Sequence, residues 1–186
     1  MSIKRKRFGK LMATLLTTVS SLILMISTPT AGQASSASSW TTQKLKEFGA
    51  SAFTFGGVNK AGTAIACVGK ADAPHWSSGA DSVIYKTRVA CNATVIVRID
   101  GALMYVAGGS LGKPASGPGQ RVAESAQSQW VSAGSPRTYY TPKQDSGVHI
   151  RKSGTYYGVS RGQIIDSCCS YLDGTASSRV YVAVKK

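Results

Sequence analysis

Residue types on which enzyme chemistry commonly depends are scarce in this sequence of 186 residues. Histidine occurs twice, and eight Asp and Glu residues stand against 22 Lys and Arg residues. The chain has no Walker-type phosphate loop, no dinucleotide-binding glycine pattern and no Cys-x-x-Cys pair, which argues against nucleotide-dependent enzymes and the common zinc modules. The few carboxylates also leave little choice for the two acids of a glycosidase. We therefore expect neither a cofactor nor a metal site.

The two histidines are the weak candidates for catalysis. His75 lies in a Pro-His-Trp loop, whereas His149 lies in the segment 148–151, where strand alternation puts it on the same face as Arg151. Two histidines, one acting as base and one as acid, can cleave a phosphodiester when a cation is near. Nothing in the spacing of these two makes them converge, so a protein without catalytic activity is the leading expectation.

A secretory signal peptide is predicted over residues 1–34. Five basic residues within the first ten are followed by an apolar run without charge, residues 11–26, and then by small residues up to Ala34. The apolar run is short for a helix of ~20 residues that spans a bilayer. We expect cleavage near Ala34 or Ala37, and export without a membrane anchor afterwards.

Export would permit disulfide bonds among the four cysteines, which are Cys67, Cys91, Cys168 and Cys169. Four cysteines allow three pairings. The simplest is a bond between Cys67 and Cys91, with Cys168 and Cys169 forming a vicinal disulfide or remaining thiols. The alternative is two long-range bridges, one from each of the two adjacent cysteines.

The dipeptide Asp100-Gly101 predicts a tight hairpin in the middle of the chain. A type I′ turn needs positive φ at both central residues, and Asp-Gly is a common solution. The segment 95–106 would then form two strands, in which Ile99 faces Ala102 and the apolar side chains share one face. That face needs a second layer to bury it.

The same dipeptide at 173–174 predicts a second hairpin, in which Ile165 lies opposite Val182. A brief helix at 43–48 is expected to begin at Thr41 or Thr42 and to end at Gly49. Short strands are predicted along the rest of the chain, at 51–55, 63–68, 82–91, 121–131, 139–140, 148–151 and 155–159.

These elements predict an all-β fold with a short N-terminal helix. Many short strands, frequent Gly and Pro turns and little helix are typical of an antiparallel β-sandwich, of Greek-key or immunoglobulin-like type, or of an open barrel. We expect disulfide stabilisation. The expected division is a signal peptide at 1–34, a leader with the short helix at 35–60 and a single β-sandwich domain at 61–186.

Three segments resemble small secreted all-β proteins of Gram-positive bacteria. They are Val89-Ala-Cys91, Thr94-Val-Ile-Val97 and Ser153-Gly-Thr-Tyr-Tyr-Gly158, and the similar region covers roughly residues 65–159. In those proteins a cysteine often stands just before the Ser-Gly-Thr-Tyr-Tyr motif, whereas Lys152 stands there in this chain. The resemblance implies an exported β-protein and has no implication for chemistry.

Positive charge is the remaining guide to function. Five of the 22 basic residues lie in 1–34, which leaves 17 basic and 8 acidic residues, a net charge of +9, in the expected mature chain. Such a charge favours anionic surroundings. We expect a secreted basic β-domain that associates with anionic cell-envelope or extracellular polymers. The alternatives are a nuclease-like secreted hydrolase that uses His149 and His75, and an antagonistic toxin or inhibitor.

The expected polyanion-binding residues are close together in the sequence. They are Arg137, Lys143, Arg151, Lys152 and Arg161. Aromatic residues in and beyond this region, Tyr139, Tyr140, Tyr156, Tyr157, Trp76 and Trp130, are candidates for an aromatic platform, because aromatic and basic surfaces bind sugars or single strands. In each Tyr-Tyr pair, however, we expect one ring in the core and one at the surface.

Overall fold

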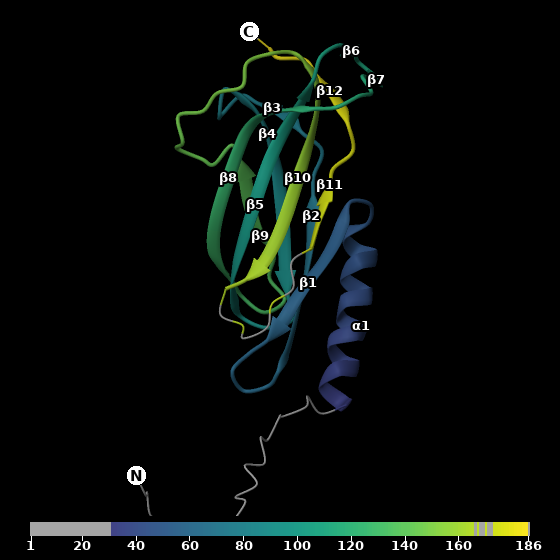
Figure 1. Ribbon diagram of the computed structural model, residues 1–186, viewed down its shortest axis with the longest axis vertical. Coiled ribbons are helices and arrows are strands. Elements are labelled where there is room, and N and C mark those ends of the chain that lie inside the picture. The colour runs from purple at the N-terminus through teal and green to yellow at the C-terminus, as the bar shows by residue number, and fades with distance from the viewer. Residues whose placement is uncertain (1–30, 166, 168–169, 171–172, 186) are drawn as a thin grey trace, which may run out of the picture.

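The computed structural model describes residues 31–165, 167, 170 and 173–185, and it shows two antiparallel sheets packed face to face with one helix on the outside (Figure 1). The predicted signal peptide lies almost wholly outside the described residues. The all-β sandwich predicted from the sequence is confirmed.

The first sheet contains five strands. They are β1 (Ala52–Val58), β2 (Ala64–Ala71), β3 (His75–Ser77), β4 (Ser82–Cys91) and β9 (Arg137–Thr141). The long strand β4 holds this sheet together, because it pairs with β2 and β3 along its length and with β9 as well. Strand β1 pairs with β2 and forms an edge.

The second sheet has the strand order β11-β10-β5-β8. Its strands are β5 (Val95–Val106), β8 (Gln120–Val131), β10 (Gly154–Ile164) and β11 (Asp173–Ala176), and β12 (Val180–Val182) pairs with the start of β10. A two-stranded ribbon of β6 (Gly109–Ser110) and β7 (Lys113–Pro114) projects at the upper end of the molecule (Figure 1).

The core lies between the two sheets and follows the alternation of the strands. On β5, Val95, Val97 and Ile99 are buried, while the intervening Ile96 and Arg98 point outward. Aromatic side chains bridge the gap from the first sheet, with Phe55 and Tyr85 fully buried. The alternation of apolar and polar residues along β5 therefore determines which face of the strand is buried.

The predicted hairpin at Asp100-Gly101 is wrong. Strand β5 runs without a break through both residues, and Asp100 pairs with Arg161 of β10. The glycine is needed for packing, since a Cβ on Gly101 would lie 2.3 Å from Thr141 Oγ1 and 2.6 Å from the hydroxyl of Tyr85. A local reading of Asp-Gly cannot detect a contact made by the opposite sheet.

The second predicted hairpin, at 173–174, is also wrong. Both residues lie in β11, where Gly174 is the partner of Arg161 on β10. A Cβ on Gly174 would lie 2.4 Å from the carbonyl oxygen of Ser160, so close approach of two backbones explains this glycine too. Val182 pairs with Gly154 and not with Ile165.

The helix α1 (Ala31–Phe48) is longer than predicted. Thr41 and Thr42 lie inside it, and Thr41 Oγ1 donates to Ala37 O at 2.8 Å instead of capping a first turn. The predicted end is confirmed, because Gly49 has a φ of 69° and its amide donates to Leu45 O at 2.9 Å. The predicted cleavage sites therefore fall inside this helix.

Helix α1 covers part of the outer face of the first sheet. Phe48 at its end is buried against Val68 of β2 and Ala90 of β4, with Trp40 and Leu45 packed beside it. The helix leaves the other half of this face, near the start of β4, without such a cover (Figure 1).

The disulfide between Cys67 and Cys91 is confirmed. The two residues are direct partners on β2 and β4, with a Cα–Cα distance of 4.1 Å, and both are fully buried. Cys168 and Cys169, for which pairing was left open, lie outside the described residues. The bond therefore joins neighbouring strands of the first sheet.

Two smaller predictions need correction. The segment 148–151 is not a strand, because it meets β4 through a single backbone hydrogen bond, from Val83 N to Ile150 O at 2.9 Å, before the chain turns into β10. The expected loop around His75 instead contains the short strand β3, which extends the line of β2 along β4.

Glutamines of β8 close one side of the sandwich. Gln127 Nε2 donates to Tyr140 O at 2.7 Å, and Gln129 Nε2 donates to Thr138 O at 3.4 Å, so side chains of the second sheet bond to the edge strand β9 of the first. These inward-facing amides explain why the edge strand β8 is rich in Gln and Ser. They also fix the position of Tyr140 and of the loop that follows it.

Candidate functional site

A hollow of about 750 Å³ lies at the upper end of the first sheet, on the part of its outer face that α1 does not cover. We call it the upper hollow. One wall is formed by β3, β4 and β9, and the other by the loop 142–149. It is lined by Ser77, Gly79, Ala80, Ser82, Ile84, Lys86, Tyr140, Pro142, Lys143, Gln144, Asp145, Ser146, Gly147, Val148 and His149.

The sheet wall of the upper hollow is set by alternation along β4. Ser82, Ile84 and Lys86 point to this side, while the residues between them point into the core. Tyr140 is the partner of Lys86 on β9, and Lys86 Nζ lies 5.6 Å from the centre of its ring. The tyrosine ring thereby supports the lysine side chain.

The loop wall is made of turn residues. Asp145 and Gly147 both have positive φ, at 61° and 70°, and the amide of Ser146 donates to Lys143 O at 3.2 Å. The loop turns back towards the first sheet at His149, where Nδ1 lies 3.0 Å from Ala80 O. A carbonyl can only accept, so Nδ1 carries the proton and Nε2 is the acceptor of the neutral ring.

The two lysines of the upper hollow form no ion pair with a described residue. Within the part of the chain that the structure describes, neither Lys86 nor Lys143 has a carboxylate within 4.0 Å. Asp145 is the one carboxylate among the lining residues, and it forms no ion pair there either. The hollow therefore has more positive than negative charge.

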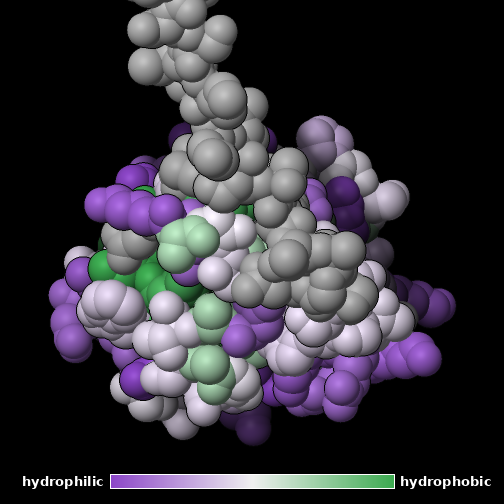
Figure 2. All heavy atoms as spheres, turned by 90° about the horizontal axis from the view of Figure 1, so that it is seen from below, coloured by the Kyte–Doolittle hydropathy of each residue, from purple (hydrophilic) through white to green (hydrophobic). Residues whose placement is uncertain are grey.

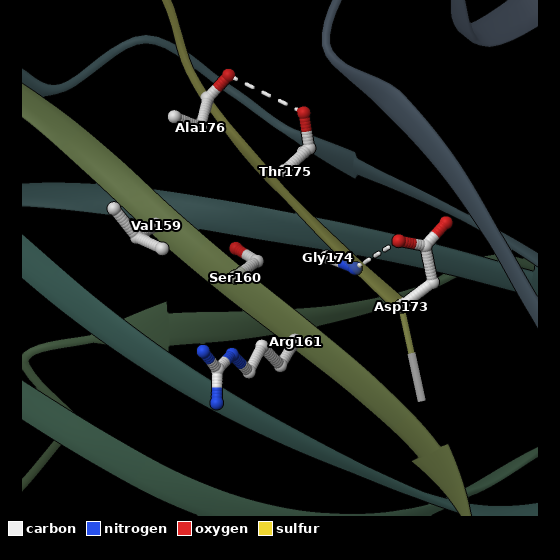
Figure 3. A pocket seen from close by; sticks show the side chains of 7 residues that line it. All are labelled: Val159, Ser160, Arg161, Asp173, Gly174, Thr175 and Ala176. Atoms are coloured by element: carbon white, nitrogen blue, oxygen red, sulfur yellow. Dashed lines mark hydrogen bonds between the residues drawn. The ribbon is translucent and has the colours of Figure 1, made fainter. Parts of the chain in front are cut away.

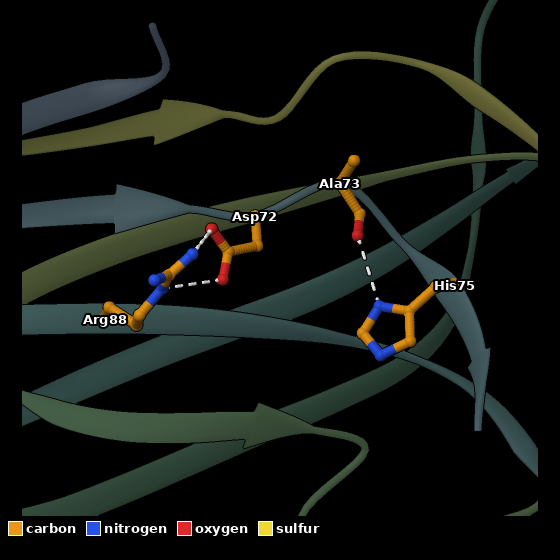
Figure 4. Close-up of polar contacts among 4 residues, drawn as sticks. All are labelled: Asp72, Ala73, His75 and Arg88. Carbon is orange, nitrogen blue, oxygen red and sulfur yellow. Dashed lines mark hydrogen bonds and ion pairs between the residues drawn. The ribbon is translucent and has the colours of Figure 1, made fainter. Parts of the chain in front are cut away.

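Five carboxylates elsewhere form ion pairs with neighbouring cations. The ion pairs are Lys44–Glu47, Arg88–Asp72, Arg98–Asp100, Arg121–Glu124 and Arg151–Asp81. Arg88 holds Asp72 through two hydrogen bonds of 2.9 and 2.7 Å, as Figure 4 shows, and this bonding raises the pKa of the guanidinium. Such paired charges contribute little net attraction for a ligand.

The two histidines are not brought together in one site. His149 lines the upper hollow, whereas His75 is exposed on β3 and is not among the lining residues. Figure 4 shows the His75 imidazole directed towards the backbone, with Nδ1 3.4 Å from Ala73 O. Of the two histidines, the upper hollow is therefore lined by His149 alone.

The five predicted polyanion-binding residues are spread over several surfaces. Lys143 lines the upper hollow, whereas Arg161 is on the outer face of the second sheet. Arg151 is paired with Asp81, and Lys152 lies over the ring of Tyr105 at 4.4 Å. Arg137 begins β9 and lies at the opposite end of that strand from Lys143. Of the five, only Lys143 lies in the hollow.

The tyrosines divide as predicted. Tyr139 and Tyr156 are buried, whereas their neighbours Tyr140 and Tyr157 point outward. Tyr140 lies beside Lys86, and Tyr157 lies beside Arg179. The hydroxyl of Tyr139 donates to Val97 O at 3.0 Å. Burial raises the pKa of Tyr139 and raises that of Tyr156 to about 12. These two rings therefore belong to the core and not to a binding platform.

Two relevant features were missed in the sequence. Lys86 had no local signal, because its partner Tyr140 is reached only through the pairing of β4 with β9. The segment 108–112 matches Gly-x-Ser-x-Gly, the pattern of the serine-hydrolase elbow. It forms the β6–β7 ribbon, in which Ser110 pairs with Lys113, and not the strand–turn–helix that such an elbow requires.

Comparison with known proteins gives no functional guide: no family model matches the chain, and no curated protein is significantly similar to it. None of the described helices is long and apolar enough to cross a membrane. Nor does any group of three or more His, Cys, Asp or Glu side chains among the described residues have the arrangement to hold a metal ion. The function must therefore be argued from the geometry of the surfaces.

Proposed function

We propose that this protein is an exported basic binding domain that associates with anionic polymers of the cell envelope or the extracellular space, and that the upper hollow binds their acidic groups. The observation that carries the proposal is that Lys86 and Lys143 enter one hollow from opposite walls, and that neither is paired with a carboxylate of the described residues. An anion between the walls would gain charge-assisted hydrogen bonds from both ammonium groups.

The geometry of Lys86 supports this role. Its side chain is held over the Tyr140 ring, so less conformational freedom is lost on binding than for a lysine free in solvent. His149 also lines this hollow, with its Nδ1 hydrogen-bonded to Ala80 O. A phosphate or carboxylate of a polymer is the chemistry that two lysine ammonium groups recognise.

The surroundings of the hollow extend the positive field. Four more cations without a carboxylate within 4.0 Å flank β7, β10 and β12 in the described part of the chain, at the same upper end (Figure 1). They are Lys113, Lys152, Arg179 and Lys185. A long polyanion contacts many such charges at once, and the field of several cations raises its rate of association.

Export and the envelope as its destination rest on three separate observations. The buried disulfide between Cys67 and Cys91 is typical of an oxidising compartment, the first 34 residues have the pattern of a signal peptide, and the resemblance is to secreted Gram-positive proteins. Phosphate-rich wall polymers are the anions that such a protein meets. They are the partner we propose.

The test compares two double variants of equal net charge in binding to poly(glycerol phosphate) at 50 mM salt. Lys86→Gln with Lys143→Gln removes both cations of the hollow, and we expect roughly a tenfold or greater loss of affinity, since each cation near an anionic surface contributes about 1 kcal/mol. Lys46→Gln with Lys60→Gln is the control, because both lysines are exposed and lie away from the hollow. Equal losses in the two variants would refute the hollow as the site.

A further inference from the structure

The outer face of the second sheet carries two hollows that share a ridge. One, of about 620 Å³, lies over β5, β8 and β10, and the other, of about 530 Å³, lies between β10 and β11 (Figure 3). Val159 and Arg161 line both of them, so these two side chains form the ridge between the hollows. We call the whole surface the ridge face.

The hollows exist because the side chains beneath them are small. The strand register places Ala102 of β5 beside Val159 of β10, and Val159 beside Ala176 of β11. On the other side Ala126 of β8 is the partner of Asp100. Alanines between longer charged side chains leave depressions in a surface that a sheet would otherwise present as flat.

The rim of the ridge face is balanced in charge. Asp100 is paired with Arg98 at 3.0 Å and Glu124 with Arg121 at 2.9 Å, so their charges cancel locally. Arg161 has no carboxylate within 4.0 Å in the described chain. On the far side of the ridge, Asp173 accepts a hydrogen bond from the amide of Gly174 at 2.7 Å (Figure 3).

This balance points to a neutral ligand rich in hydroxyl groups. Carboxylates accept hydrogen bonds from hydroxyl groups, and guanidinium groups donate hydrogen bonds to hydroxyl oxygens. A rim with both kinds of group therefore suits a ligand whose hydroxyls act as donors and as acceptors. The three carboxylates Asp100, Glu124 and Asp173 are balanced by three arginines, so this face has no net positive charge to attract a polyanion, in contrast to the upper hollow. Among biological polymers, a neutral saccharide chain best fits this requirement.

An exposed aromatic ring lies on the same face. Trp130 is 58% exposed and is the partner of Ile96 on β5, whose carbonyl accepts from Ile165 N at 3.0 Å. Trp130, Ile96 and Ile165, the residue directly after β10, make an apolar row at the lower end. Figure 2 shows strongly hydrophobic residues at the surface of that end. A flat indole beside such a row suits the apolar face of a sugar ring.

We infer that the ridge face binds a neutral saccharide chain, which stacks on Trp130 and reaches Arg161 and the two hollows. Trp130 is four residues along β8 from Ala126, about 14 Å at the rise of a strand, so the ligand must be several sugar units long. This site is separate from the upper hollow, on the opposite sheet, and its ligand differs in charge. The protein would thus contact two components of an envelope at once.

The test uses neutral hexasaccharides of β-1,4-linked N-acetylglucosamine, β-1,4-linked glucose and β-1,3-linked glucose, titrated by calorimetry and by tryptophan fluorescence. We expect at least one to bind, with an affinity that is unchanged between 50 and 500 mM salt. Trp130→Ala should weaken binding about tenfold or more, and Arg161→Ala should weaken it severalfold. Leu111→Ala and Arg137→Ala are matched controls, since both residues are exposed and lie off the ridge face.

Three results would overturn the inference. The first is no binding of any hexasaccharide at millimolar concentration. The second is an equal loss in the control variants, or binding that disappears at high salt. The third is a concentration-dependent dimer that Trp130→Ala disrupts while no saccharide binds, which would assign the face to a second copy of the chain. Unchanged melting temperatures of the variants establish that any loss does not come from unfolding.

Discussion

The upper hollow and the ridge face use similar residues and differ in how the charges are paired. On the ridge face, Arg98 and Asp100 stand two apart on one strand, and alternation brings them to the same side, where they neutralise each other. In the upper hollow, Lys86 and Lys143 come from distant segments, and neither forms an ion pair with a described residue, although Asp145 stands two residues from Lys143 in the turn. The regular alternation of a strand therefore pairs Arg98, whereas the irregular loop leaves Lys143 available for a ligand.

The two surfaces also differ in how their shape arises. The ridge face is part of a regular sheet and is hollow only because alanines lie between charged residues. The upper hollow is a space between a sheet and an irregular loop, and it depends on the turn at Asp145 and on the contact of His149 with Ala80. Loops of this kind vary more easily than sheets, so the upper hollow is the more adaptable of the two.

The largest expected effect comes from breaking the covalent bond in the sheet that carries the upper hollow. Cys67→Ala with Cys91→Ala should lower the free energy of unfolding by ~3 kcal/mol, since the bond closes a loop of 24 residues in the unfolded chain. The second sheet has no such bond among the described residues. Urea unfolding followed by tryptophan fluorescence measures the change, and an unchanged midpoint would contradict it.

A smaller effect is expected where the two sheets meet. Gly101→Ala places a Cβ 2.3 Å from Thr141 Oγ1 and should cost about 1–3 kcal/mol in free energy of unfolding by overpacking. Gly79→Ala is the matched control, because nothing lies within 4 Å of its added Cβ. Thermal unfolding of both variants tests the difference. Equal melting temperatures would mean that Gly101 is not required by packing.

The buried tyrosines that join the sheets predict an alkaline loss of stability. A tyrosine in the unfolded chain ionises near pH 10, whereas burial raises the pKa of Tyr156 to about 12 in the folded protein. The unfolded state therefore loses its proton first, and the free energy of unfolding falls by about 1 kcal/mol per pH unit from pH 10 to pH 12. Urea unfolding at pH 9, 10 and 11 measures this slope.

Two tyrosine variants separate this effect from general alkaline damage. Tyr156→Phe should make the slope shallower, because the group that titrates is gone. Tyr140→Phe, which changes an outward-facing ring, is the matched control. Equal slopes in all three proteins would show that the buried hydroxyl has no part in the pH dependence.

The strand alternation was predictable from sequence because it is a local property. The segments 82–91 and 121–131 are close to β4 and β8, and the split of the Tyr139-Tyr140 pair into a buried and an outward ring follows from period two. The disulfide was predictable because its two cysteines lie close in sequence and join neighbouring strands. Each of these features needs only short-range information.

The wrong hairpin predictions concern glycines whose role depends on contacts with other strands. Gly101 and Gly174 are glycines because other atoms approach them closely, and the same residue type is also the commonest signal for a turn. The grouping of Lys86 with Lys143 could not be predicted for the same reason, since the two residues meet in one hollow only after β4 pairs with β9. The partners of a cation are a property of the folded surface. The sequence therefore identifies the five predicted cations, but it does not show which of them lie on one surface.

The most direct test measures the affinity of three proteins for both proposed ligands. Wild type, Lys86→Gln with Lys143→Gln, and Trp130→Ala are each titrated with poly(glycerol phosphate) and with the neutral hexasaccharide that binds most tightly. We predict that the lysine variant loses affinity for the polyphosphate alone and that Trp130→Ala loses affinity for the saccharide alone. A variant that weakens both ligands equally, or neither, would contradict the claim that charge pairing divides this protein into two distinct binding surfaces.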